Sequence, residues 1–308
     1  MEIAFCADRN MLAALHVSAT FVLCTASRKI DFLILGEGIS VADLDLLRES
    51  LKQTGKEFTL RFHTVEPCRF KACPKLAGGL ANYYRLLVPD FSDSRRIIYM
   101  DCDTLCLAKI EDLEEWNLDT APIGMCAESP LAGCQDTKTA KLLGGGSGCA
   151  YFNSGFIVFD TRAWRDGGYT AKCLDFAEKS QPDYHEQSAL NVILHRRIAE
   201  VPARFNFHTN VRANWPFLKR PNSGQGCLLH FVDYPKPWSA GGRWVHPFGK
   251  FWWDEYRKTA HFKKNRLRPP APRWDAKTRF GYRKALKDKI LFTLYERGAI
   301  LPKGVPRA

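Results

Sequence analysis

The amino-acid sequence predicts an α/β fold with a mainly parallel central sheet. Short apolar runs that contain β-branched and aromatic residues alternate with segments whose apolar residues recur at helical spacing. This alternation is typical of strand–helix–strand units, in which successive strands pair in parallel. With 308 residues and a hydrophobic content of 45%, the chain can bury a sizeable core in one large domain or two ordinary ones.

The N-terminal part of the chain contains three expected strands and two expected helices. Apolar runs indicate the strands, and the second helix begins after a serine, a typical N-cap residue. The strands are expected at 2–7, 30–36 and 58–65, and the helices at 12–23 and from Ser40 to about 54. Asp8 and Asn10 follow the first strand, where such residues commonly shape a turn.

The rest of the chain is expected to continue this alternation. Pro89 should stop one helix, and the corner Asn153-Ser154-Gly155 before another strand is typical of a turn. Strands are expected at 96–100, 121–126, 156–160 and 228–231, helices at 80–87 and from Thr161 and Tyr184, and loops at 128–148 and 232–238. The last loop has a proline on each side of Lys236, which fixes where the ammonium points.

Two aspartates one residue apart follow the strand at 96–100. Asp101 and Asp103 would repel each other unless a cation lay between them, and hard carboxylate oxygens suit Mg²⁺ or Mn²⁺. Many such pairs are only solvated turn residues. The position after an apolar strand favours a metal and diphosphate site, because open α/β sheets bind ligands beyond the carboxyl ends of their strands.

Cysteine usage and hydropathy indicate a chain of reduced thiols with no membrane span. The eleven cysteines are scattered, odd in number and form no Cys-x-x-Cys pair, which argues against zinc. The N-terminus lacks the basic start and apolar core of a signal peptide, and no apolar run approaches the roughly 20 residues that cross a bilayer. We expect a cytoplasmic protein, peripheral on the inner face of the plasma membrane.

Most of the formal net charge of +12 lies in the C-terminal tail. Residues 251–308 contain 16 Lys or Arg and 5 Asp or Glu, interleaved with aromatic residues, and segment 276–295 has helical spacing. Cations mixed with aromatic rings suit an anionic membrane surface. A solvated tail and a partner-binding helix are alternatives, and nucleic-acid binding is a less favoured third. The expected domains are a catalytic domain at 1–250 and this tail at 251–308.

Four motifs occur in the order typical of one enzyme family. They are Phe5-Cys6-Ala7-Asp8-Arg9-Asn10, Tyr99-Met100-Asp101-Cys102-Asp103, Phe152-Asn153-Ser154-Gly155 and the segment from His230 to Trp238. From residue 1 to about 251 the chain resembles glycosyltransferase family 8, retaining nucleotide-sugar transferases that include glycogenin, and most closely its bacterial lipooligosaccharide galactosyltransferase branch. The resemblance implies a GT-A fold and transfer of galactose or glucose from a UDP-sugar to a saccharide or glycolipid acceptor, in lipopolysaccharide or surface polysaccharide synthesis.

The resemblance also implies a role for each matching residue. The uridine and the rest of the donor would be held by Ala7, Asp8, Asn10 and Cys102, the diphosphate by Arg85 and Lys236, and the sugar by Glu128, Asn153, Glu186 and Gln187. The metal ligands would be Asp101, Asp103 and His230, with Mn²⁺ as the ion and Mg²⁺ as the alternative. Without the resemblance, Glu186 and Gln187 would be helix caps and His230 a core histidine.

Three positions depart from the family pattern. Asp233 replaces a motif glycine, and a carboxylate there would repel a diphosphate unless it turns away or binds a basic group. Met11 replaces an aromatic residue and would cover a uracil ring less rigidly. Glu186 replaces an aspartate, which leaves the choice between galactose and glucose open.

Two reaction paths fit these residues. Attack of the acceptor from the leaving-group side would use Gln187, Glu186 and Lys236 as catalytic residues, whereas a double displacement would need Glu186 as the nucleophile. We expect the first path. The competing functions are a nucleotidyltransferase, for which no triphosphate cradle is recognisable, and a non-catalytic protein that binds nucleotide sugars or membranes.

Overall fold

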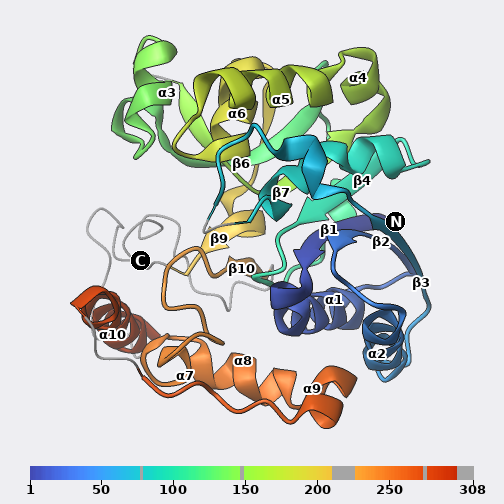
Figure 1. Ribbon diagram of the computed structural model, residues 1–308, viewed down its shortest axis with the longest axis vertical. Helices are drawn as coiled ribbons and strands as arrows, with labels where there is room; N and C mark the ends of the chain where they lie inside the picture. Colours follow the sequence, from blue (N-terminus) through green and yellow to red (C-terminus); the bar gives the residue numbers. More distant parts are fainter. Residues whose placement is uncertain (77–78, 146–148, 210–225, 273–275, 297–308) are drawn as a thin grey trace, which may run out of the picture.

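The computed structural model describes residues 1–76, 79–145, 149–209, 226–272 and 276–296 (Figure 1). Within these ranges, seven strands form one sheet in the order β3-β2-β1-β4-β7-β6-β8. The strands are β1 (Glu2–Asp8), β2 (Ile30–Glu37), β3 (Phe58–Thr64), β4 (Arg96–Met100), β6 (Ile123–Pro130), β7 (Ala150–Asp160) and β8 (Ile198–Val201). Neighbours pair in parallel except at β7, which runs antiparallel to β4 and β6. The expected α/β fold with a mainly parallel sheet is confirmed.

Helices cover both faces of this sheet, as Figure 1 shows. They are α1 (Leu12–Thr25) and α2 (Val41–Lys52) on one face, and the 3-10 helix η3 (Ala81–Phe91), α4 (Thr161–Asp166), α5 (Tyr169–Ser180) and α6 (His185–Ile193) on the other. Alternate residues of each strand point to opposite faces, so Phe5 packs with α1 and its neighbour Ala4 packs on the η3 side. Ser40 caps α2 as predicted, by accepting a hydrogen bond from the backbone of Asp43.

A second, three-stranded sheet holds the imidazole of His230 in place. It consists of β5 (Thr104–Cys106), β10 (Leu228–His230) and β9 (Phe207–His208), with β10 in the middle. Strand β5 begins directly after Asp103, and its antiparallel pairing with β10 places His230 opposite Thr104. The register of this pairing therefore brings His230 beside the turn that carries both aspartates.

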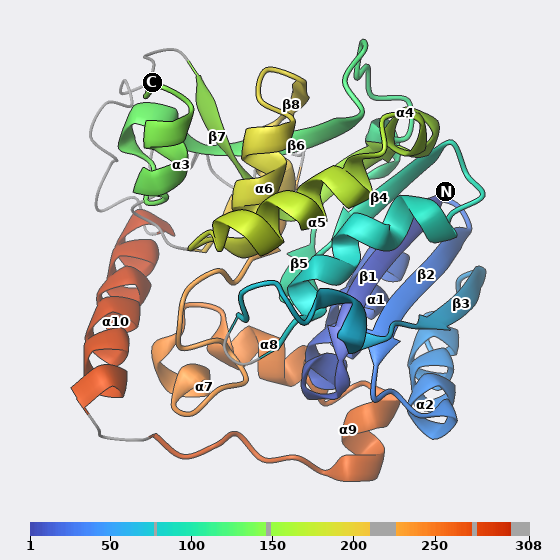
Figure 2. The same ribbon diagram turned by 45° about the horizontal axis from the view of Figure 1, so that its top comes forward.

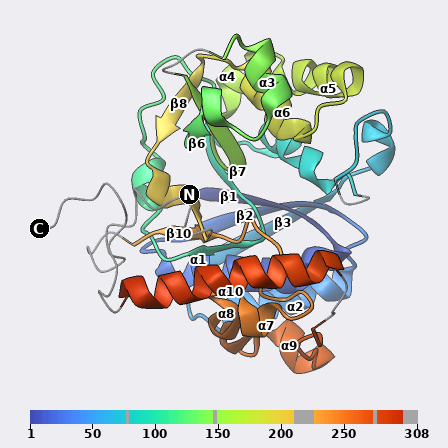
Figure 3. The same cartoon turned by 90° about the vertical axis from the view of Figure 1, so that its left-hand side faces the viewer.

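The C-terminal region packs against α1, α2 and the three-stranded sheet. It contains α7 (Gly242–Val245), α8 (Gly249–Tyr256), α9 (Ala260–Asn265) and α10 (Ala276–Glu296), and α10 lies alongside α7 (Figures 2 and 3). Trp252, Trp253 and Tyr256 of α8 are buried in a cluster with Val17 of α1. The expected domain boundary at 250 thus falls inside a helix, and these three rings belong to the core rather than to a lipid-facing surface.

Two local expectations were wrong, and several short helices were not foreseen. Segment 128–148 is not one loop, because β6 continues to Pro130 and α3 (Thr137–Leu142) follows after an Asp136 N-cap. Residues 153–155 form no chain-reversing turn, since β7 runs straight through them with register shifts against β6. Short 3-10 helices that were not foreseen are η1 (Arg9–Met11), η2 (Pro67–Phe70), η4 (Glu111–Leu113), η5 (Leu131–Gly133) and η6 (Ala203–Asn206).

The helix predicted around Arg85 is present as a 3-10 helix, but it does not stop at Pro89 as expected. Pro89 lies inside η3, which continues to Phe91. Side chains three residues apart eclipse each other in a 3-10 helix. Asn82 and Arg85 consequently point the same way, and both contact Glu186 of α6.

No helix among the described residues has both the length and the apolar content to cross a bilayer.

All eleven cysteines are free, and most are buried, as the sequence predicts.

A buried histidine pair joins α1, α2 and α9. Nδ1 of His16 lies 2.8 Å from Oγ of Ser50, and the ring of His16 lies 4.9 Å from that of His261. Nδ1 of His261 lies 2.6 Å from the hydroxyl of Tyr256. Burial, reinforced by the neighbouring His261, lowers the pKa of His16 from its ordinary value to about 3.

We predict that acid weakens this junction through His16. The pKa of His16 is lower in the folded state than in the unfolded chain. The contribution of its neutral imidazole to the free energy of unfolding is therefore complete above about pH 6.5 and is lost as the pH falls toward 3. At pH 5 the loss should be about 2 kcal/mol relative to pH 8. Urea unfolding of the wild type and of His16→Asn at pH 8 and at pH 5 measures it, because the variant should lose about 2 kcal/mol less between these two pH values. Identical pH profiles for His16→Asn and the wild type would refute this prediction.

Candidate active site

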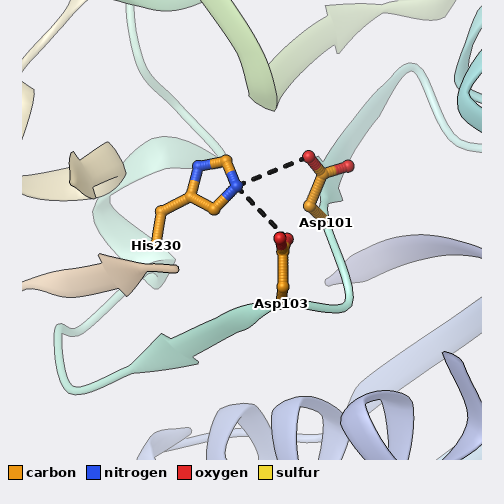
Figure 4. A group of neighbouring side chains, drawn as sticks. All are labelled: Asp101, Asp103 and His230. Carbon is orange, nitrogen blue, oxygen red and sulfur yellow. Dashed lines mark ion pairs between the residues drawn. The ribbon is translucent and has the colours of Figure 1, made fainter. Parts of the chain in front are cut away.

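Two carboxylates and one imidazole converge at the carboxyl end of β4. Nε2 of His230 lies 3.2 Å from Oδ1 of Asp103 and 3.6 Å from Oδ2 of Asp101 (Figure 4). The ligand atoms of the three residues all lie within 4.8 Å of one another. The structure therefore brings together the three residues that the sequence predicts as metal ligands.

Gly155 makes this convergence sterically possible. A Cβ atom at this position would lie 2.2 Å from Cε1 of His230 and 2.9 Å from Oδ2 of Asp101. The backbone carbonyl of Gly155 also accepts a hydrogen bond from the backbone of Asp101 at 2.9 Å. Only glycine lets β7 approach the cluster this closely.

A directed chain of hydrogen bonds fixes the tautomer of His230. The backbone N–H of Gly155 donates to Oδ1 of Asn153, which therefore faces the cluster with its oxygen. Nδ2 of Asn206 donates to the same oxygen at 2.8 Å, so Oδ1 of Asn206 faces Nδ1 of His230, also at 2.8 Å. Nδ1 then carries the proton, and the lone pair of Nε2 points at the aspartates. The donor set fits a divalent cation.

Lys236 supplies positive charge to the same cluster. Its Nζ lies 2.7 Å from Oδ2 of Asp103 and also donates to the carbonyl of Phe231. Burial raises the pKa of Asp103, but the charge and the hydrogen bond of Lys236 act in the opposite direction, and that pKa lies below its ordinary value. Asp103 is therefore ionised, as a metal ligand must be.

Arg85 connects the metal cluster to the predicted sugar subsite. Its guanidinium is buried, with Nη2 at 2.9 Å from Oδ1 of Asp101 and Nη1 at 3.4 Å from Oε1 of Glu186. Nη1 also donates to the carbonyl and hydroxyl oxygens of Ser154. Burial lowers the pKa of Arg85, but the charge of Asp101 outweighs this and raises it. Contact of Arg85 with a diphosphate stays a prediction.

The four residues predicted for the sugar subsite form one hydrogen-bonded network. Oε1 of Glu186 accepts from the hydroxyl of Ser154 at 3.0 Å, and Oε2 accepts from Asn82. Oε1 of Gln187 accepts from the backbone of Ser154 at 3.0 Å. The remaining contacts converge on Glu128, whose Oε2 accepts from Gln187 at 3.3 Å and from Asn153 at 3.2 Å. The carboxylate of Glu186 and the amide of Gln187 bind this network and are not helix caps.

The residues predicted to hold the uridine lie at the carboxyl end of β1, beside β4. Asp8 accepts hydrogen bonds from the backbone of Asn10 at 2.9 Å and of Met11 at 3.1 Å, so it caps η1. Ala7 is buried, and the thiol of Cys102 donates to the carbonyl of Cys6. Asp8 thus shapes the turn that follows β1, and its contact with a nucleotide stays a prediction.

Sequence reasoning missed three residues of the site, namely Asn82, Ser154 in its bridging role, and Asn206. Had the 3-10 helix been recognised, the three-residue spacing of Asn82 and Arg85 would have indicated that Asn82 points into the site beside Arg85. Asn206 has no sequence signal, because its partners Asn153 and His230 are far away in the chain.

Comparison with known proteins identifies the family. The sequence pattern of "Glycosyl transferase family 8" matches residues 2–242, which is most of the chain. The chain belongs to this family. It is therefore a glycosyltransferase, as its ordered motifs predict.

Curated relatives agree with this assignment. General stress protein A of Bacillus subtilis (strain 168) is 29% identical over 279 residues, which cover 83% of this chain and 91% of that protein. The lipopolysaccharide 1,3-galactosyltransferase of Salmonella typhimurium is 23% identical over 252 residues, which cover 78% of this chain and 74% of that protein.

Solved structures confirm the fold. The crystal structure of the galactosyltransferase LgtC in complex with donor and acceptor sugar analogs has a TM-score of 0.72 at 22% identity. The match covers 86% of this chain and 99% of that one. The expected GT-A fold is thereby confirmed.

We predict that Asn206 controls metal affinity through His230. Asn206→Ala removes the acceptor for the Nδ1 proton, so Nε2 loses its fixed lone pair and affinity for Mn²⁺ should fall about tenfold to a hundredfold. Isothermal titration of Mn²⁺ measures this without any turnover. Asn117→Ala, at an exposed asparagine, is the control and should bind as the wild type does. Unchanged Mn²⁺ affinity in Asn206→Ala would contradict the assigned tautomer.

Proposed function

We propose that this glycosyltransferase moves a hexose, galactose or glucose, from a UDP-sugar to a glycan acceptor with retention of configuration. The observation that carries the proposal is the convergence of Asp101, Asp103 and His230 with the ammonium of Lys236. The names of relatives that act on lipopolysaccharide, among them the 1,3-galactosyltransferase, support an acceptor in lipopolysaccharide or surface polysaccharide synthesis.

The metal cluster and Lys236 would together bind the donor diphosphate. Two carboxylates and an imidazole suit Mn²⁺, with Mg²⁺ as the alternative, and such a cation acts as a Lewis acid on the departing phosphate oxygens. Lys236 adds a point charge beside Asp103, where negative charge develops as the sugar leaves. The donor also needs contacts for its uracil, ribose and hexose. We assign the first two to Ala7, Asp8, Asn10 and Cys102, and the hexose to Glu128, Asn153, Glu186 and Gln187.

Attack of the acceptor from the leaving-group side is the path that these contacts favour. A double displacement would require a free carboxylate nucleophile. Both oxygens of Glu186 already accept hydrogen bonds, from Ser154 and from Asn82, and its charge lies near Arg85. Glu186 is therefore better suited to stabilise positive charge on the sugar than to form a bond with it, and Gln187 would support it from the same helix.

Asp103→Asn should abolish transfer without unfolding the protein. The amide removes one anionic ligand and the partner of Lys236, so turnover should fall about 1000-fold. Release of UDP from UDP-galactose and UDP-glucose in Mn²⁺ measures it, because donor hydrolysis needs no acceptor. Asp93→Asn, at an exposed aspartate, should leave turnover unchanged. Full turnover by Asp103→Asn in added Mn²⁺ would reject the site.

We also propose that the exposed face of α10 binds an anionic membrane surface and so brings the enzyme to a lipid-linked acceptor. Its exposed apolar residues are Phe280, Leu286, Ile290 and Leu294. Exposed cations, Arg279, Arg283 and Lys287, are interleaved with them on the same side of the helix. Apolar side chains with cations between them match the interface of an anionic bilayer.

Leu286→Glu with Ile290→Glu should weaken binding to vesicles that contain phosphatidylglycerol. The fall should be at least about tenfold, since each apolar side chain contributes about 1.5 to 3 kcal/mol when it is buried. Flotation of the full chain measures binding, with vesicles of pure phosphatidylcholine as the neutral reference. The control is Val41→Glu, an exposed apolar residue on α2. Equal flotation of the double variant and the wild type would exclude this face, and a partner helix or nucleic acid would then be its occupant.

A further inference from the structure

The segment that carries Lys236 is held from outside by helix α10. We call residues 231–241, between β10 and α7, the lysine loop. Its Asp233, which stands where the family pattern has glycine, forms an ion pair with Lys284 of α10 at 3.0 Å. Both side chains of the pair are about one third exposed. The carboxylate therefore binds a basic group, which is one of the two outcomes expected for a charged residue at this position.

Helix α10 touches the lysine loop at two further points. Gly281 packs against the loop, since a Cβ there would lie 3.3 Å from the carbonyl oxygen of Tyr234. The hydroxyl of Tyr282 donates to the carbonyl of Ala240 at 2.8 Å, and its ring covers Gly241, where φ is +73°. The helix thus contacts the loop on both sides of Lys236.

The pair includes a residue of the same loop as Lys236. Asp233 stands three residues before Lys236 in the same loop, and Lys236 contacts Asp103 of the metal cluster. Asp288, one turn beyond Lys284 on α10, lines the same small cavity as Asp233. Without the ammonium of Lys284, the carboxylate of Asp233 would lose its cationic partner, and the field around the lysine loop would become more negative.

We propose that Asp233 and Lys284 are positioning residues for Lys236. Their ion pair ties the lysine loop to α10 and neutralises the carboxylate that replaces the family glycine. Through it, the C-terminal helix helps to set the place and the effective charge of the ammonium that meets the diphosphate. The part of this inference that concerns the donor rests on the proposed function, whereas the tie between loop and helix does not.

The tie is tested without any donor by hydrogen exchange on the full chain. Lys284→Met should speed exchange of the backbone amides of residues 231–241 about fivefold, the effect of losing about 1 kcal/mol of local stability. Lys264→Met, at an exposed lysine of α9, should leave these amides unchanged. Unchanged exchange in Lys284→Met would overturn the tie, whether or not the protein turns over UDP-sugars.

The charge effect is tested by a double-mutant cycle on donor kinetics. Lys284→Met should raise the KM for the UDP-sugar about fivefold, because it leaves the carboxylate of Asp233 unpaired. Asp233→Asn should change KM less than twofold, and the double variant should return to the value of Asp233→Asn. A merely structural role would instead make the double variant as poor as Lys284→Met or poorer, and that result would overturn the proposal.

A wild type that turns over no UDP-hexose would refute the proposed function itself. The hydrogen-exchange comparison would still decide whether α10 holds the lysine loop.

Discussion

The site depends on holding two like charges next to each other in a largely buried place. Asp101 and Asp103 follow one short strand, and each receives its own cationic partner from a distant part of the chain, Arg85 for the first and Lys236 for the second. The imidazole of His230 lies beside both carboxylates, and the lone pair of its Nε2 points at them. The fold therefore prepares a cation site whose charge is already partly balanced, which lowers the electrostatic cost of keeping both carboxylates ionised.

Strand β7 links the two halves of the site. Gly155 leaves room for the imidazole of His230, and Asn153 binds Asn206, the partner of that imidazole. Ser154, between them, binds both Arg85 and Glu186. A three-residue motif that looks like a turn in the sequence thus joins the metal cluster to the predicted sugar subsite, which Asn153 also reaches through Glu128.

Sequence reasoning succeeded where the signal was local and failed where it was not. The apolar strands and the cap at Ser40 are each encoded by a few adjacent residues, and the structure confirms them. The Asp101 and Asp103 pair is equally local, and the structure places both residues beside His230. The 3-10 form of the helix around Arg85 was missed because the apolar spacing indicates a helix but not its type. Asn206 could not be found, since its role depends on partners from other strands. Composition alone also could not separate the buried rings of Trp252, Trp253 and Tyr256 on α8 from the exposed ring of Phe280 on α10.

The C-terminal region contacts the loop that bears Lys236, although its basic composition suggests a separate tail. The indole N–H of Trp253 donates to the carbonyl of Pro237 at 2.9 Å, so α8 as well as α10 reaches the loop that bears Lys236. Replacing this region with that of a relative would remove contacts that hold the loop of Lys236 in place. Changes at the end of the chain are thus constrained by contacts with the loop that bears Lys236, near the metal cluster.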